Sequence, residues 1–484
     1  MTFAQSKQDA FNGARQKVGG TNNTAFNQNR SNNFNDYRQK LNAEYISKTK
    51  EKWKDFNSFR GLVLPDRDTK PVDPIEMSDE DARKDKKDNQ LNIGEVVSPI
   101  RNNGSPSPIA PVQEIPDSDP QYVSFSYLST SLQVRKPKGN SFRLSGTDEA
   151  SVANAWEQLC DTRYNNMIID CLRLRSSLKL CDWAYLMMLQ SLGNSYCGFH
   201  TNESTLLMAY IYSQSGYKMR LGQANGKLHM LYSSQHKVYG TPYCEIDGDK
   251  FYAMSKNVGN LSINAARYPK EKSMSLWVAN NPKVSFSASP IRTLTSKRYP
   301  EMSIQVRENN NLFPFFDSFP VSEVGGNFMT RWAIYANAPI CQETQSILYP
   351  QLRSFIDGYS ELDAVERLLN WVQTAFVYEY DDKVWGGDRA FFPDETLYYP
   401  YCDCEDRSIL FTRLVRDLLG LKCILIYYPG HLASAVCFNE NVRGDYIQLN
   451  GTRYVVCDPT YIGASVGRTM PDMDNNTAKI IVLQ

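Results

Sequence analysis

Cysteine is missing from the first 159 residues of the 484-residue chain, and the eleven cysteines that follow are odd in number and unevenly spaced. Such a distribution is a poor disulfide framework, so we expect at most one or two bridges and mostly buried thiols. Long apolar runs are missing too: none approaches the ~18 residues of a spanning helix, so we expect no transmembrane segment. No charge of one sign dominates, because 53 Lys and Arg balance 53 Asp and Glu. We therefore expect no nucleic-acid partner.

Motifs for export, for nucleotide binding and for zinc binding are missing as well. The first residues, MTFAQSKQDAF, have neither a basic n-region nor an apolar h-region, so no intact signal peptide is expected there. The same stretch is compatible with the stub of a removed signal, which leaves cytoplasm and export open at this point. The chain has no Walker or dinucleotide glycine pattern, and no paired C-x-x-C knuckles that would indicate zinc. We expect neither a metal nor a cofactor.

The chain is long and apolar enough for two or three domains, since 42% of its residues are hydrophobic and 12% aromatic. Residues 1–117 differ from the rest. An aromatic stripe at steps of three or four predicts a helix over 32–59 that ends at Gly61, and six prolines in 98–120 predict an extended, disordered linker. The helix is expected to dock on the body of the protein or on a partner. Removal of this whole segment is expected to leave a folded body.

Later segments predict a mixed fold of class α+β. VSFSYLSTSLQV from about residue 122 alternates like a strand, and residues 149–215 have helical periodicity with Gly at the helix ends. Short alternating runs, among them SMSLWVA, KVSFSA and FMTRWAIYA, predict a β-rich section over 219–340. Residues 360–420 are again helical, and the last 60 residues are strands with an Asn450-Gly451 hairpin turn.

Three residues could form a thiol-based catalytic site. Cys404 precedes EDRSILFTRLVRDLLG, so we expect it at a helix N-terminus, where free N–H groups lower a thiol pKa. The acidic neighbours on either side act in the opposite direction. His431 begins a strand after a Pro-Gly turn, and Asp458 ends the next strand but one. Hairpin-connected strands can therefore bring together a nucleophile, a base and a residue that orients the base.

The segments TLYYPYCDCEDRSILFTRLVRDLLGLKCILIYY, GHLASAVCF and GTRYVVCDPTYIGASVG resemble the transglutaminase-like superfamily, above all exported transglutaminase-like proteins of Bacteroidetes. LLNWVQTAFVYEYD resembles the entry helix of the same family. The resemblance covers roughly residues 346–484. It implies a papain-like core, with Cys404 as nucleophile, His431 as general base and Asp458 as the residue that orients it. It also implies export to the periplasm or cell envelope.

The resemblance implies an enzyme that forms a thioester with an amide of a protein or peptide substrate, followed by acyl transfer or hydrolysis. The two reactions share these steps, so the sequence leaves them open. Cys402 is the rival nucleophile, and Trp385 and Tyr401 are candidate substrate-binding or oxyanion residues. The alternative is a non-catalytic envelope scaffold on the same fold, with the N-terminal helix binding an envelope partner.

The same core can be aligned twice along the chain. An offset of 204 places Gly216 on Gly420, and a slip of two residues then places His229 on His431. Ser255 falls opposite Asp458, and the nucleophile position holds His200. Such a copy has no thiol and would be inert. The expected organisation is an N-terminal helix and linker (1–117), a degenerate transglutaminase-like domain (118–260), a β-rich section (261–345) and a catalytic domain (346–484). Residues 195–256 and 399–459 should superpose.

Overall fold

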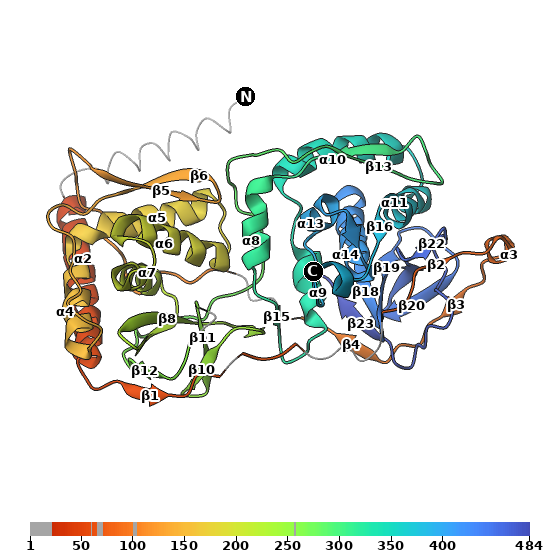
Figure 1. Cartoon of the computed structure of the whole chain (residues 1–484). Coiled ribbons are helices and arrows are strands. Elements are labelled where there is room, and N and C mark those ends of the chain that lie inside the picture. The colour runs from red at the N-terminus through yellow and green to blue at the C-terminus, as the bar shows by residue number, and fades with distance from the viewer. Residues whose placement is uncertain (1–21, 60, 65–70, 100–103, 256–257) are drawn as a thin grey trace, which may run out of the picture.

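The computed structural model describes residues 22–59, 61–64, 71–99, 104–255 and 258–484. Its helices and mainly antiparallel sheets form two lobes side by side, with helix α8 (Phe313–Ser318) between them (Figure 1). The predicted α+β class is confirmed. Among the described residues, no helix combines the length and the apolar character needed to cross a bilayer.

Helices form one layer of the first lobe. α4 starts after Asp148, whose side chain accepts a hydrogen bond from the N–H of Ser151 at 3.0 Å, as expected of Asp at an N-cap. The predicted strand near residue 122 is a hairpin, and its alternate side chains are buried against this layer. The elements are α4 (Glu149–Leu159), α5 (Asn165–Ser177), α6 (Asp182–Cys197), α7 (Asn202–Gln214), β5 (Tyr122–Tyr127) and β6 (Thr130–Arg135).

A six-stranded sheet forms the other layer of this lobe, in the order β1-β12-β7-β8-β11-β10. Asn225-Gly226 and Asp247-Gly248 form its two tight turns, and all four residues have positive φ, as type I′ hairpins require. The strands are β1 (Lys54–Phe56), β7 (Met219–Ala224), β8 (Lys227–Ser233), β10 (Tyr243–Ile246), β11 (Asp249–Ala253) and β12 (Leu261–Ile263).

The second lobe has a seven-stranded sheet in the order β3-β20-β21-β19-β18-β23-β4. Helix α14 packs on β18 and β19, and α11 packs on α14. The predicted Asn450-Gly451 turn joins β20 to β21. The elements are α10 (Gln342–Ile356), α11 (Glu361–Ala375), α13 (Pro393–Tyr398), α14 (Cys404–Leu419), β3 (Asn89–Gln90), β4 (Glu95–Val97), β18 (Lys422–Tyr428), β19 (His431–Cys437), β20 (Asp445–Leu449), β21 (Thr452–Cys457) and β23 (Lys479–Val482).

The two sheets share one connectivity. In the first lobe α7 leads into the hairpin β7-β8, next to which lie β11 and β10 on one side and β12 on the other. In the second lobe α14 leads into β18-β19, flanked in the same way by β21 and β20, and by β23. An N-terminal strand borders each sheet beyond β12 or β23, antiparallel for β1 and parallel for β4.

The expected β-rich section between the lobes is wrong in large part. SMSLWVA and KVSFSA contain no strand, and FMTRWAIYA contains helix α9 (Thr330–Asn337), of which every residue is buried. An element that is buried on all sides has no polar face, so its sequence shows no reliable alternation of apolar and polar residues. The hydrophobic pattern therefore could not distinguish a strand from a helix here. β12 belongs to the first sheet, and β13 (Arg292–Thr295) and β14 (Ser303–Val306) form a hairpin against α10 and α11.

The N-terminal segment is not a helix followed by a disordered linker. Helix α2 (Asn22–Thr49) ends before the predicted Gly61, and Tyr45 and Trp53 are buried in the first-lobe core. β1 enters the first sheet, and β3 and β4 border the second. Near residue 107 the chain crosses Gly216 so closely that a Cβ there would lie 1.8 Å from the Ser107 carbonyl oxygen. The expectation of a separate 1–117 unit is therefore wrong for the described residues, and this packing leads us to expect that removal of the segment destabilises the protein.

Candidate functional site

Cys404 is the first residue of α14, as the sequence predicts. Asp403 is the N-cap and forms a capping box with Asp406, which accounts for the start of the helix at this residue. The helix ends at Gly420 in the left-handed conformation, with φ 69°. The hydroxyl of Ser408, one turn along, donates to the Leu432 carbonyl at 2.7 Å and ties the helix to β19.

His431 and Asp458 lie together, as predicted. β19 and β21 are antiparallel neighbours, and His431, the first residue of β19, lies two residues along β19 from Ala433, the residue that the register places opposite Asp458. His431 Nε2 and Asp458 Oδ2 are 2.8 Å apart, and both side chains are almost fully buried. Asp458 Oδ1 accepts the backbone N–H groups of Thr460 at 2.8 Å and Tyr461 at 3.2 Å. These bonds fix the carboxylate, which in turn fixes the imidazole.

The other imidazole nitrogen is unengaged. His431 Nδ1 is buried and has no hydrogen-bond partner among the described residues, Cys404 included. Cys404 is 3% exposed. The backbone N–H of Leu432, the residue next to His431, acts on its sulfur. The structure therefore places His431 in contact with Asp458 through Nε2, and His431 Nδ1 has no hydrogen-bond partner among the described residues.

The expected low thiol pKa is wrong for this structure. Burial, followed by the charges of Asp403 and Glu405, raises the pKa of Cys404 well above its ordinary value. The Leu432 N–H acts in the opposite direction but does not outweigh these effects. The sequence indicated both the helix terminus and the acidic neighbours, but it could not indicate that the thiol is buried together with those carboxylates.

The other candidates lie around this centre. Cys402, the rival nucleophile, is buried in β17 (Tyr401–Cys402), and its thiol donates to the Val377 carbonyl at 3.8 Å. Trp385 is half-buried, with its ring 4.8 Å from that of Tyr399. Tyr401 is 41% exposed. No bond of these three side chains to His431 or Asp458 is found in the described residues. All eleven cysteines are in the described part of the chain and are free thiols.

An N-terminal segment crosses the edge of the site. We name residues 72–77 the strap. The Val72 N–H donates to the carbonyl of Gly430, which precedes His431, at 2.9 Å, and the Tyr378 hydroxyl donates to the Val72 carbonyl at 3.4 Å. Further along the strap, β2 (Ile75–Glu76) pairs with β22 (Tyr461–Ile462), just after Asp458. The strap thus lies against the chain on both sides of the His-Asp pair.

Two buried polar side chains that the sequence analysis missed support the site. Gln373 Nε2 donates to the carbonyls of Asp458 at 3.0 Å and Tyr461 at 2.8 Å. Arg407, which is 1% exposed, donates to the Phe376 carbonyl at 2.8 Å. Each is a polar residue on the buried face of a helix, α11 or α14. That position within an apolar stripe is the signal that could have identified them.

The helix start in the first lobe differs from the prediction. α7 begins at Asn202, whereas His200 lies two residues earlier, exposed and at φ 55°. Asn202 Oδ1 accepts the Leu228 N–H at 2.9 Å. The offset of 204 places Leu228 on Leu432, whose N–H acts on the Cys404 sulfur. The Asn202 side chain therefore accepts from the N–H that corresponds to the one acting on the thiol, whereas exposed His200 does not.

The slip of two residues between the lobes is also wrong. Continuing the register of β8 with β11 places His229 opposite Ser255, and their side chains are 3.5 Å apart. Continuing the register of β19 with β21 places Ala433, not His431, opposite Asp458. The sequence alignment of Ser255 with Asp458 agrees with this register, whereas that of His229 with His431 does not.

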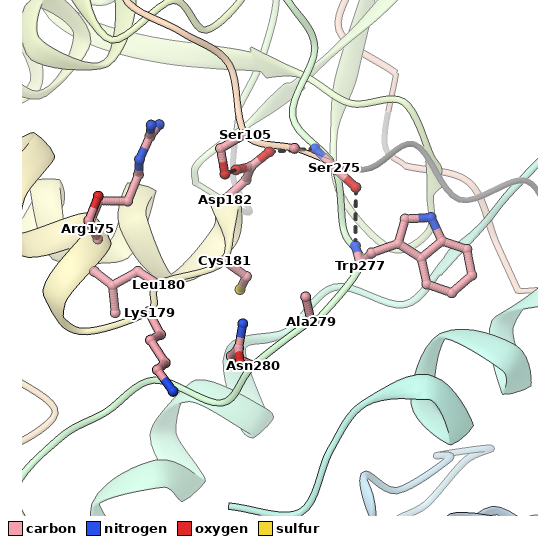
Figure 2. A pocket seen from close by; sticks show the side chains of 12 residues that line it. Ser105, Arg175, Lys179, Leu180, Cys181, Asp182, Ser275, Trp277, Ala279 and Asn280 are labelled. Carbon is pink, nitrogen blue, oxygen red and sulfur yellow. Dashed lines mark hydrogen bonds between the residues drawn. The ribbon is translucent and has the colours of Figure 1, made fainter. Parts of the chain in front are cut away.

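A cavity of about 370 Å³ lies in the first lobe, between α6 and the chain near residue 275 (Figure 2). Its polar groups bond one another. Asp182 accepts from the Ser105 hydroxyl at 2.6 Å, the Tyr217 hydroxyl at 2.7 Å and the Ser275 N–H at 2.9 Å. Arg175 donates to the Tyr217 hydroxyl at 3.1 Å. These hydrogen bonds therefore hold the segment near residue 105 against the helices of the first lobe.

Comparison of the chain with protein-family models, with curated proteins and with solved structures found no match.

Proposed function

We propose that the second lobe is a cysteine-dependent enzyme that acts on amide bonds of proteins or peptides through a thioester. Cys404 is the nucleophile, His431 the general base and Asp458 the residue that orients it. One observation carries the proposal: the buried 2.8 Å His431–Asp458 pair leaves Nδ1 unengaged on the strand that borders the thiol. An oriented imidazole with one nitrogen available is what a thiol nucleophile requires of its base.

The reaction conserves atoms and protons in two steps. His431 takes the proton of the Cys404 thiol, the sulfur attacks the amide carbonyl carbon, and the C–N bond breaks as the imidazolium gives its proton to the leaving amine or ammonia. An incoming amine or water then attacks the thioester and gives a proton to His431, and the sulfur leaves as thiolate. The amine completes acyl transfer, whereas water completes hydrolysis.

The finer fold assignment is part of the same proposal. A helix that bears the nucleophile and packs on an antiparallel sheet supports a papain-like, transglutaminase-like core in the second lobe. The shared strand order supports an origin of both lobes by internal duplication. In this interpretation the first lobe is the inert copy, since Asn202 and Ser255 stand where the second lobe has Cys404 and Asp458.

The surroundings of Cys404 favour a non-catalytic scaffold instead. Cys404 is buried, its pKa is raised well above the ordinary value, and the strap lies against the chain on both sides of the His-Asp pair. A scaffold would keep the three residues as packing groups without reactivity. The catalytic interpretation explains the burial of Cys404 differently. A segment at the edge of a site can move away from it, so movement of the strap would expose the thiol to substrate.

The test uses the full chain and two substrates. Ammonia release is measured from a blocked glutamine peptide, with and without a primary amine, and new N-termini are measured on casein. We expect one of the two activities, its loss in Cys404→Ser, and its retention in Cys402→Ser. Loss in Cys402→Ser alone would identify the other thiol as the nucleophile. No activity on either substrate, combined with no reaction of Cys404 with iodoacetamide, would favour the scaffold.

A further inference from the structure

Five carboxylates gather where α14 begins. Asp381 starts the short helix α12 (Asp381–Val384), Asp388 lies in the loop after it, and Glu405 is the second residue of α14. Oxygen atoms of these three side chains lie within 4.8 Å of one another. Asp403 and Asp406 form an overlapping group with Asp381 at the same spacing. Four of the five residues are buried.

The carboxylates of this cluster differ in the donors that contact them. Arg331 pairs with Asp388 at 2.8 Å, and the backbone N–H of Arg389 donates to Asp381 at 2.8 Å. Glu405 is different: it is only 5% exposed, and its Oε1 atom has no hydrogen-bond partner among the described residues. A buried carboxylate oxygen without a donor costs several kcal/mol. A cation that contacts this oxygen would offset that cost.

We propose that Asp381, Asp388 and Glu405 bind a Ca²⁺ ion. Carboxylate oxygens are ligands that hard divalent cations prefer, and Ca–O distances are about 2.4 Å. Two oxygens on opposite sides of such an ion are therefore about 4.8 Å apart, so three oxygens that lie within 4.8 Å of one another can all contact one ion. Mg²⁺ gives up its water reluctantly and is seldom held by protein ligands alone, which favours Ca²⁺ at a site built from protein carboxylates.

The ion goes beyond the proposed function, because none of its three ligands belongs to the Cys-His-Asp set. It also has a physical consequence for the structure. Asp381 and Asp388 flank the loop that carries Trp385, and Glu405 lies on α14, so one ion links the loop to the helix. Binding to the folded state alone stabilises it by mass action. Binding and stability can therefore be measured without any thiol chemistry.

The test is a titration of the full chain with Tb³⁺, which replaces Ca²⁺ and emits when a nearby tryptophan is excited. Trp385 lies between Asp381 and Asp388 in the chain and serves as the donor. We expect saturable emission that Ca²⁺ displaces, with Mg²⁺ at least about tenfold weaker as a competitor. Glu405→Gln and Asp388→Asn should each weaken binding at least tenfold.

Two controls keep the test decisive. Glu379→Gln removes a half-buried carboxylate that pairs with Lys383 in the neighbouring segment, and it should leave the affinity unchanged. Cys404→Ser should also bind Tb³⁺ as the natural chain does, so a failure of the proposed chemistry does not affect this result. Far-ultraviolet circular dichroism verifies that each variant folds.

Three outcomes would overturn the proposal. The first is the absence of Tb³⁺ emission together with no rise of the thermal midpoint in millimolar Ca²⁺. The second is equal binding in the natural chain and in both Glu405→Gln and Asp388→Asn. The third is displacement by Mg²⁺ as effective as by Ca²⁺, which would contradict the assignment to Ca²⁺.

Discussion

At the scale of single residues, the proposed mechanism requires that each imidazole nitrogen of His431 faces a different partner. His431 Nε2 lies 2.8 Å from Asp458 Oδ2, and in the proposed mechanism the carboxylate accepts the Nε2 proton and Nδ1 acts as the base. The bonds from Thr460 and Tyr461 hold the other carboxylate oxygen in place. Rotation of the carboxyl group would break all three interactions.

Asp458→Asn tests this directly. The Asn carbonyl can keep the two backbone bonds, so its amide NH₂ faces Nε2 and forces the proton onto Nδ1, where it blocks the base. We expect thioester formation to slow at least ~10-fold, about 1.4 kcal/mol of transition-state stabilisation. The measurement is a single-turnover rate, compared with Cys404→Ala, which should have none. An unchanged rate would remove Asp458 from the mechanism.

His236 predicts a pH-dependent stability that has no connection with catalysis. Burial lowers its pKa from 6.5 to about 4. The unfolded chain therefore binds a proton between these two values that the folded chain does not, and stability is lost as pH falls from about 6.5 to about 4. The contribution at pH 7 is on the order of 3 kcal/mol.

The measurement is urea unfolding of the natural chain and of His236→Gln at pH 7 and pH 4.5. The advantage of His236 over the uncharged Gln should shrink as pH falls. His229→Gln is the control, because His229 is only half-buried and its pKa is lowered less. A difference between His236 and Gln that stays constant with pH would show that the imidazole does not titrate as its burial requires.

At the scale of elements, the periodicity identified most helices and strands that have one buried face. It succeeded for α14, whose apolar stripe starts after Cys404 and ends at Gly420, and for the Asn450-Gly451 hairpin. It failed for α9, which is buried on all sides, and for the short N-terminal strands, whose pairing partners lie hundreds of residues away. A strand of two or three residues that pairs with a strand so far away in the sequence shows no local hydrophobic pattern from which it could be predicted.

Helix α2 supplies a prediction at this scale. Tyr45 is buried between the rings of Trp156 and Tyr268, at centroid distances of 4.6 Å and 4.5 Å. Tyr45→Ala should lower the free energy of unfolding by about 3–5 kcal/mol. Tyr37→Ala, on the same helix but 44% exposed, should change it by less than about 0.5 kcal/mol. Equal effects in a urea titration would mean that α2 does not dock as described.

The strap, residues 72–77, supplies a second prediction at the scale of elements. Val72→Pro removes the N–H that donates to Gly430. Losing a hydrogen bond of about 1 kcal/mol should make opening of the strap roughly fivefold more frequent. Iodoacetamide should then alkylate Cys404 faster by a similar factor. The matched control is Val63→Pro, since the Val63 side chain is 85% exposed. If both variants leave the rate unchanged, the strap does not limit access to the thiol.

At the scale of the whole molecule, the sequence predicted a repeated core, and the shared strand order of the two sheets supports it. The alignment of individual residues between the two lobes was wrong in detail. Hydrophobic patterns alone fit a helix followed by a hairpin equally well with or without a shift of two residues between the two lobes. The hydrogen bond from the Leu228 N–H to the Asn202 side chain and the strand registers decide which residues of the two lobes correspond. Burial of the thiol among carboxylates depends on tertiary packing, so local sequence could not give it.

The most direct test of the central claim is the alkylation rate of Cys404 at pH 7, followed by peptide mapping in the natural chain, in His431→Ala and in His229→Ala. The rate is compared between variants, because Cys437 is more exposed than Cys404 and reacts for that reason alone. Removal of the base should slow Cys404 at least ~10-fold. His229→Ala should leave it unchanged. Equal rates in all three proteins would contradict a nucleophilic centre at Cys404, His431 and Asp458.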